Sequence, residues 1–183
     1  SFALWLHSGK LAASEAQRFN GCVQDAPRLF GQQWFIDSEA LEVGPSRQTP
    51  ALTLWRKKAA PSIERTGIGM LRLGHREYWD TTWINNYRDR LHQGLVQFVE
   101  TGDPRWWRYF EAVATHHRDV DLIHFCPEHP DWVGGCHAYG EDHTSCEPMS
   151  NIGLNVDGLL EHHLMTGDPE SLAAARGLAE QVI

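Results

Sequence analysis

Two stretches of the sequence have the same layout, and together they decide the fold. Residues 86–117 read NYRDRLHQGLVQFVETGDPRWWRYFEAVATHH, and residues 151–182 read NIGLNVDGLLEHHLMTGDPESLAAARGLAEQV. Aligned without gaps, the two copies share an Asn, a central Leu, the complete TGDP and a late Ala. An internal repeat sets the architecture, because each copy is one supersecondary unit that buries its apolar face against a neighbour.

Each copy predicts two helices that meet at a tight corner. Apolar residues recur at helical spacing before and after each TGDP, and the first such stripe runs from Ile84 to Val99. Gly102 and Gly167 suit the left-handed position after a helix, the following Asp can cap the next helix, and Pro fits its first position. We therefore expect four helices in two antiparallel hairpins from about Thr81 onward, with corners at these glycines.

The N-terminal part has a different character. Short β-like runs such as ALTLWRKK, residues 51–58, alternate with Gly and Pro breaks, so we expect residues 1–76 to be irregular and strand-containing, the tail of an upstream β-domain. Within it, residues 24–41 can hold a short helix. The chain begins without Met and stops inside the last expected helix, which predicts a piece of a longer protein.

Charge and hydropathy exclude some classes of function. The formal net charge is −8, and an acidic chain is a poor nucleic-acid binder because phosphate affinity comes from Lys and Arg. No apolar run approaches the length needed to span a bilayer. We therefore expect neither nucleic acid nor membrane as a partner.

Between the two repeats lies a segment dense in reactive side chains. Residues 124–147 read HFCPEHPDWVGGCHAYGEDHTSCE, with four His, three Cys and five carboxylates. We expect the whole of residues 120–149 to be a long loop, and long loops inside a domain are usually functional. The repeat architecture thus predicts a site on the loop that joins two hairpins.

Metal binding and cross-linking are the two structural explanations for the cysteines. No C-x-x-C pair is present and no regular calcium loop is visible, so we predict no cofactor, with zinc and calcium left as weaker alternatives. A disulfide from Cys126 or Cys136 to Cys146 would pin the loop in a secreted or periplasmic parent protein. Three unpaired thiols packed in the loop are the remaining alternative.

The helical part resembles a known family. Residues 69–183 look like the toroid segment of exo-rhamnogalacturonan-lyase-like proteins, which pair β-domains with an (α/α) barrel. The resemblance is carried by Trp83-Ile84-Asn85-Asn86 with Asp89 and His92, by the HHRDVDLIH run ending at His124, and by the VGG-x-H element that ends at His137. It implies a mainly α fold in which residues 77–183 form a partial (α/α) toroid of two hairpins, and it implies chemistry on a polysaccharide.

Acid–base groups of the loop predict proton transfer at a sugar. A lyase needs a base for the proton α to a uronate carboxylate and an acid for the leaving oxygen, roles that His and Tyr serve. We therefore expect β-elimination on an acidic, pectin-like polysaccharide. The expected catalytic residues are His137, Tyr139, Asp142 and His143, and the expected substrate-binding residues are Trp83, Asn85, Asn86, Asp89, His92, Trp132 and Glu147.

Two other functions stay open at this stage. The abundant carboxylates also fit a glycoside hydrolase of the (α/α) toroid type, which needs a pair of carboxylates across the scissile bond. A non-catalytic helical repeat that binds glycans or a protein through its Trp-rich face is the third alternative. Four histidines at helical positions are expected to be structural, namely His116, His117, His162 and His163.

Overall fold

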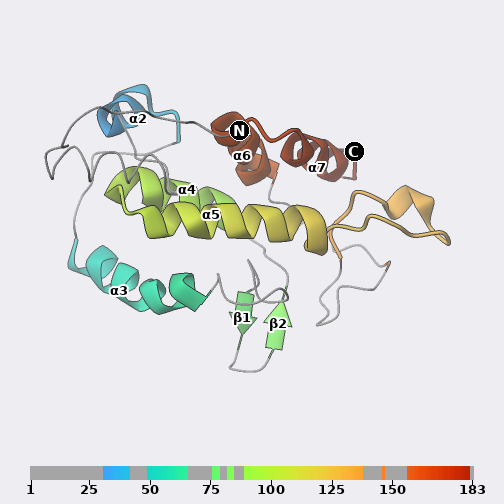
Figure 1. Cartoon of the computed structure of the whole chain (residues 1–183), viewed down its shortest axis with the longest axis horizontal. Helices are drawn as coiled ribbons and strands as arrows, with labels where there is room; N and C mark the ends of the chain where they lie inside the picture. The colour runs from blue at the N-terminus through green and yellow to red at the C-terminus, as the bar shows by residue number, and fades with distance from the viewer. Residues whose placement is uncertain are drawn as a thin grey trace, which may run out of the picture.

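The computed structural model describes residues 31–41, 49–65, 76–78, 82–84, 89–137, 146 and 156–181, and this part is mainly α-helical. Figure 1 shows α4 and α5 at the centre, with the other helices around them. The elements are α2 (Gln32–Ser38), α3 (Pro50–Arg65), β1 (Arg76–Tyr78), β2 (Thr82–Ile84), α4 (Arg90–Thr101), α5 (Pro104–His116), the π-helix η1 (His117–Asp121), the 3₁₀ helix η2 (Pro130–Trp132), α6 (Val156–Thr166) and α7 (Pro169–Glu180).

The two expected hairpins are present, with corners where the repeat predicted them. Helices α4 and α5 meet at Gly102, and α6 and α7 meet at Gly167, with φ of 66° and 77° respectively. Asp103 and Asp168 cap the helices that follow, and each of those helices begins at Pro. These corners confirm the hairpin prediction, whereas closure of a toroid stays a prediction because only two hairpins are described.

Helix α4 begins later than the sequence pattern predicted. Ile84, which we counted on its apolar stripe, lies instead in β2, where it is paired with Arg76 of β1 in an antiparallel ladder. The helix starts at Arg90 because Asp89 caps it: the carboxylate accepts the backbone N–H of His92 at 3.0 Å. Asp89 itself has a left-handed backbone, with φ of 42°, which separates the helix from the chain before it.

Helix α3 corrects the strand that we expected in residues 51–58. The run contains Ala, Leu, Lys and Arg, which are good helix formers, and the helix is then fixed by contacts to the first hairpin. Arg56 forms an ion pair with Glu100 of α4, and the Trp55 ring stacks on Trp106 of α5 at a centroid distance of 5.8 Å. The short helix expected within residues 24–41 is confirmed by α2.

The hydrophobic core lies where the two hairpins face each other. Leu95 and Phe98 of α4, Phe110 of α5 and Leu159 of α6 are fully buried. Helix α6 approaches α4 most closely at Gly158, where an added Cβ would lie 2.3 Å from the Cβ of Leu91. This close approach brings polar residues of α4 and α6 into contact beside the core.

Residues 120–137 of the expected inter-repeat loop have a defined backbone arrangement. Residues 117–121 form η1, and the chain then folds back on itself, with Leu122 bridged to Cys136 and reciprocal hydrogen bonds that link Ile123 to Gly134 and Gly135 at 2.8 Å. Figure 1 shows this segment projecting at the C-terminal end of α5. No helix in the described part of the chain is long and apolar enough to cross a membrane.

Candidate functional site

Three polar side chains meet where α4 begins and α6 passes over it. His92 Nδ1 lies 2.8 Å from Glu161 Oε1, and both residues lie on the facing sides of the two helices. Asp89 accepts the N–H of His92 through Oδ1 and the N–H of Gly158 through Oδ2, at 3.0 and 3.1 Å. The His92 side chain is 33% exposed and that of Glu161 15%, so the imidazole is the more accessible member of this pair.

The electrostatics of this cluster favour a protonated imidazole. The hydrogen bond to Glu161 raises the pKa of His92 above its usual value, and this outweighs the opposing effect of burial. Burial raises the pKa of Asp89, although the two backbone N–H donors act against it. A carboxylate at Nδ1 fixes the tautomer and orientation of His92, which leaves Nε2 as the nitrogen that can exchange a proton with another molecule.

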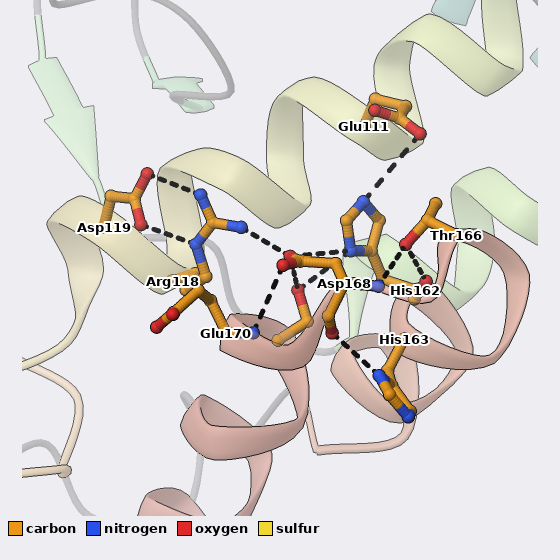
Figure 2. Close-up of polar contacts among 9 residues, drawn as sticks. Glu111, Arg118, Asp119, His162, His163, Thr166, Asp168 and Glu170 are labelled. Atoms are coloured by element: carbon orange, nitrogen blue, oxygen red, sulfur yellow. Dashed lines mark hydrogen bonds and ion pairs between the residues drawn. The ribbon is translucent and has the colours of Figure 1, made fainter. Parts of the chain in front are cut away.

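A second polar network is centred on Arg118 of η1. The guanidinium donates to both oxygens of Asp119, at 2.6 and 2.8 Å, and to Oδ2 of Asp168 at 2.5 Å. Figure 2 shows Arg118 between these two carboxylates. The hydrogen bonds that Arg118 donates to Asp119 raise the pKa of its guanidinium, which further favours the charged form. Because each of its nitrogens donates to a carboxylate of the protein, Arg118 works as a tie between η1 and the second TGDP corner.

His162 joins this network through Ser171. His162 Nδ1 and the Ser171 hydroxyl are 2.8 Å apart, and that hydroxyl donates to Asp168 Oδ2 at 2.8 Å. In a hydrolytic triad the histidine stands between the carboxylate and the serine, whereas here the serine stands between the other two. Burial lowers the pKa of His162, and both His162 and Ser171 are inaccessible. The arrangement is therefore structural, as expected for His162.

Beside Arg118 lies a cavity of about 240 Å³. Its polar end is formed by Arg118, Asp119, His124 and Glu170, and its walls come from Gly134 and small residues along one face of α7. Gly134 has φ of 94°, and an added Cβ there would lie 3.2 Å from the backbone of Gly177, so the two glycines let the loop touch the helix. The cavity is large enough for one small ring.

A buried carboxylate holds two histidines at the end of α5. Asp121 Oδ2 lies 2.9 Å from His117 Nδ1, and Asp121 Oδ1 lies 3.2 Å from His116 Nε2. Although burial opposes ionisation, the hydrogen bonds from His116 and His117 hold the pKa of Asp121 below its usual range. All three side chains are buried, which agrees with the structural role expected for both histidines.

The predicted site residues in the described part fall into two places. Asp89 and His92 lie together at the α4–α6 contact. His137 lies elsewhere, beside the end of η1: its backbone N–H donates to the carbonyl of Asp121 at 2.8 Å, and its side chain is buried. Trp132 stacks on His129 at 3.8 Å, so one face of the indole is covered by an imidazole.

For the other predicted site residues the structure describes no side chain. Trp83 is placed in β2 through its backbone alone. The predictions for the others lie outside the described residues, and these are Tyr139, Asp142, His143, Asn85, Asn86 and Glu147. Their catalytic and substrate-binding roles stay predictions.

Glu161 is the site residue that sequence reasoning missed. It is separated from His92 by 69 positions, and no motif connects the two. The available signal was the position of Glu161 one residue before the His162-His163 pair, on the helix face that the repeat places against the first hairpin. Among the described residues no group of three His, Cys, Asp or Glu side chains is arranged to hold a metal ion.

Searches against protein-family models, curated proteins and solved structures gave no match for this chain. The resemblance to exo-rhamnogalacturonan-lyase-like proteins therefore stays a prediction.

Proposed function

We propose that this chain belongs to a carbohydrate-active enzyme that cleaves an acidic, pectin-like polysaccharide by β-elimination, with His92 as the proton-transfer group. The observation that carries the proposal is the His92–Glu161 pair: a partly exposed imidazole whose inner nitrogen is held by a carboxylate. That arrangement is the one by which enzymes orient a histidine for acid–base chemistry. The choice of polysaccharide rests on the sequence resemblance alone.

In β-elimination the proton α to the uronate carboxylate leaves, the C–O bond to the departing sugar breaks, and a C=C bond forms. Neutral His92 accepts the proton at Nε2, and ionised Glu161 stabilises the resulting imidazolium. The raised pKa of His92 makes the neutral imidazole a stronger base. After it has accepted the proton, the imidazolium can act as the general acid that protonates the leaving oxygen. Activity should therefore rise with pH as His92 loses its proton.

A glycoside hydrolase is the second candidate, and the raised pKa of Asp89 favours it. Hydrolysis needs one carboxyl group that stays protonated and one that is ionised, and Asp89 and Glu161 lie close enough to influence each other. Against this role, both oxygens of Asp89 already accept backbone N–H groups that hold α4 and α6 together. Elimination through His92 does not require Asp89 to act in catalysis while it also holds α4 and α6 together.

The deciding experiment incubates the protein with pectic and other acidic polysaccharides and follows two signals. Ultraviolet absorbance reports the unsaturated uronate of a lyase, and new reducing ends without that absorbance report a hydrolase. His92→Gln should lower turnover by about a hundredfold or more. The matched control is His163→Gln, because the imidazole of His163 is tied to the backbone of Asp168 and lies outside the proposed site.

Each other outcome overturns the proposal in a defined way. Unsaturated products that form at the full rate in His92→Gln would remove His92 from the mechanism. Reducing ends alone would establish hydrolysis. Glycan binding without cleavage of any acidic polysaccharide would establish the non-catalytic alternative.

A further inference from the structure

Two cysteines of the inter-repeat segment come together although they are far apart in the chain. The Sγ atom of Cys146 lies 3.8 Å from the carbonyl oxygen of Phe125, the residue before Cys126. The neighbouring Cys126 thiol is the main reason that the pKa of the Cys146 thiol is raised. Cys126 is buried and Cys146 is half-buried, and neither is in a disulfide in this structure.

We propose that Cys126 and Cys146 are a redox-modification site, at which a low-molecular-weight disulfide converts the two neighbouring thiols into one intramolecular disulfide. The sequence left open whether Cys126 or Cys136 would join Cys146. The structure favours Cys126, because the Sγ atom of Cys146 lies 3.8 Å from the carbonyl oxygen of Phe125, the residue directly before Cys126.

The reaction proceeds by two exchanges. The half-buried Cys146 loses its proton, and the thiolate attacks one sulfur of the small disulfide, which breaks that S–S bond and releases one small thiolate. Cys126 then loses its proton and attacks the Cys146 sulfur, which forms the protein disulfide and releases the second small thiolate. The two protein protons end on the two small thiols. The protein is oxidised by two electrons and the small disulfide is reduced by two.

The cross-link would restrain the segment that forms one wall of the cavity. It closes a loop of roughly 20 residues, which removes conformational freedom from the unfolded chain and stabilises the folded state. That loop contains Gly134, which touches α7, and it begins two residues after His124 at the polar end of the cavity. Oxidation would therefore fix Cys146 to the segment whose Gly134 touches α7.

Peptide mapping of the whole protein tests the site. The purified protein is equilibrated with oxidised and reduced glutathione at several ratios, remaining thiols are alkylated in acid, and a non-reducing digest is analysed by mass spectrometry. The expected product is a peptide pair joined between Cys126 and Cys146, and oxidation should raise the melting temperature by about 5–10 °C. A pair joined through Cys136, or a glutathione adduct on Cys146 that never resolves, would overturn the proposal.

Two variants sharpen the test. Cys146→Ser changes a half-buried residue and should abolish both the joined peptide and the rise in melting temperature. Cys136→Ser is the matched control, and it should keep the Cys126–Cys146 pair. If Cys146→Ser still stabilises on oxidation to the same extent, the stabilising cross-link lies elsewhere and the proposal is wrong. Because wild-type mapping reads the pairing directly, the test holds even if a variant folds poorly.

Discussion

The two hairpins turn their corners identically but are tied into the molecule differently. In both, the Thr hydroxyl donates to the carbonyl four residues earlier, at 2.6 Å in the first corner and 2.5 Å in the second, and the Asp N–H donates to that Thr oxygen at 3.2 Å. Both glycines donate their N–H back to the preceding helix at 2.7 Å. The local geometry of TGDP is thus independent of its surroundings.

The capping aspartates differ in what else they bind. Asp103 pairs with Arg105, two residues further along the same helix, in an exposed contact. Asp168 accepts from Ser171 and from Arg118, 50 positions away in η1. The same residue at the same position therefore acts as a local cap in one hairpin and as a tertiary anchor in the other.

The largest difference in stability is expected between variants of the two capping aspartates. Asp168→Ala removes a cap and takes away the acceptor of the buried Ser171 hydroxyl and of Nη1 of Arg118, so the free energy of unfolding should fall by about 3 kcal/mol. Asp103→Ala loses the cap and an exposed pair, which costs about 1 kcal/mol. Urea denaturation of both variants measures this. Equal losses would show that the contacts of Asp168 to η1 add nothing.

Removing the arginine partner of each cap should also cost more stability at the second corner than at the first. Arg118→Ala removes the tie between η1 and the second corner and should cost about 1–2 kcal/mol. Arg105→Ala, its matched control, removes a contact in which the arginine is half exposed, and should cost less than about 0.5 kcal/mol. Denaturation midpoints compare the two. A loss in Arg105→Ala as large as in Arg118→Ala would contradict the distinction.

The corner glycines should behave alike, because nothing in either surrounding meets an added side chain. A Cβ at Gly102 or Gly167 would have no atom within 4 Å, so Gly→Ala costs only the strain of a left-handed backbone, about 1 kcal/mol at each corner. Thermal unfolding of the two single variants tests this. A difference larger than about 0.5 kcal/mol between them would mean that the corners are not locally equivalent.

Acid should remove the stability that the ionised Asp168 carboxylate contributes. Burial opposes the ionisation of Asp168, but hydrogen bonds from Ser171 and from the Glu170 N–H, together with Arg118, lower its pKa below 3.8. A lowered pKa stabilises the folded state above the unfolded value, and this contribution disappears as pH falls through the folded pKa. Asp168→Asn should therefore be less stable than wild type at neutral pH, with the gap closing below about pH 4. A gap that persists in acid would contradict this assignment.

Local sequence patterns predicted the hairpin corners. They did not predict features such as the start of α4 and the helix at residues 51–58. The TGDP corners could be predicted because Gly allows the left-handed turn, Asp caps the next helix and Pro fits its first position. The start of α4 was missed because Asp89 takes a left-handed conformation that usually indicates Gly. Residues 51–58 were interpreted as strand-like although they contain good helix formers, and their contacts with Glu100 of α4 and Trp106 of α5 could not be seen in the sequence.

Only part of the candidate site was predicted, because its residues come from two hairpins that are distant in the sequence. Asp89 and His92 belong to the run that carries the resemblance, so the sequence identified them. Their partner Glu161 belongs to the other hairpin, and only the close approach of α6 at Gly158 brings it to His92. His137 was predicted from the VGG-x-H element and the titratable groups around it, which indicate chemistry but not burial. The pairing between hairpins is therefore the information that the structure adds.

The most direct test of the account is the titration of His92 by NMR in wild type and in Glu161→Gln. The account predicts a wild-type pKa above the ordinary 6.5 and a clear fall in Glu161→Gln, because the hydrogen bond to that carboxylate is the main cause of the rise. Glu180→Gln, a change at the far end of α7, should leave the titration unmoved. A His92 that titrates at its ordinary value, or one whose pKa is the same in wild type and Glu161→Gln, would contradict the account.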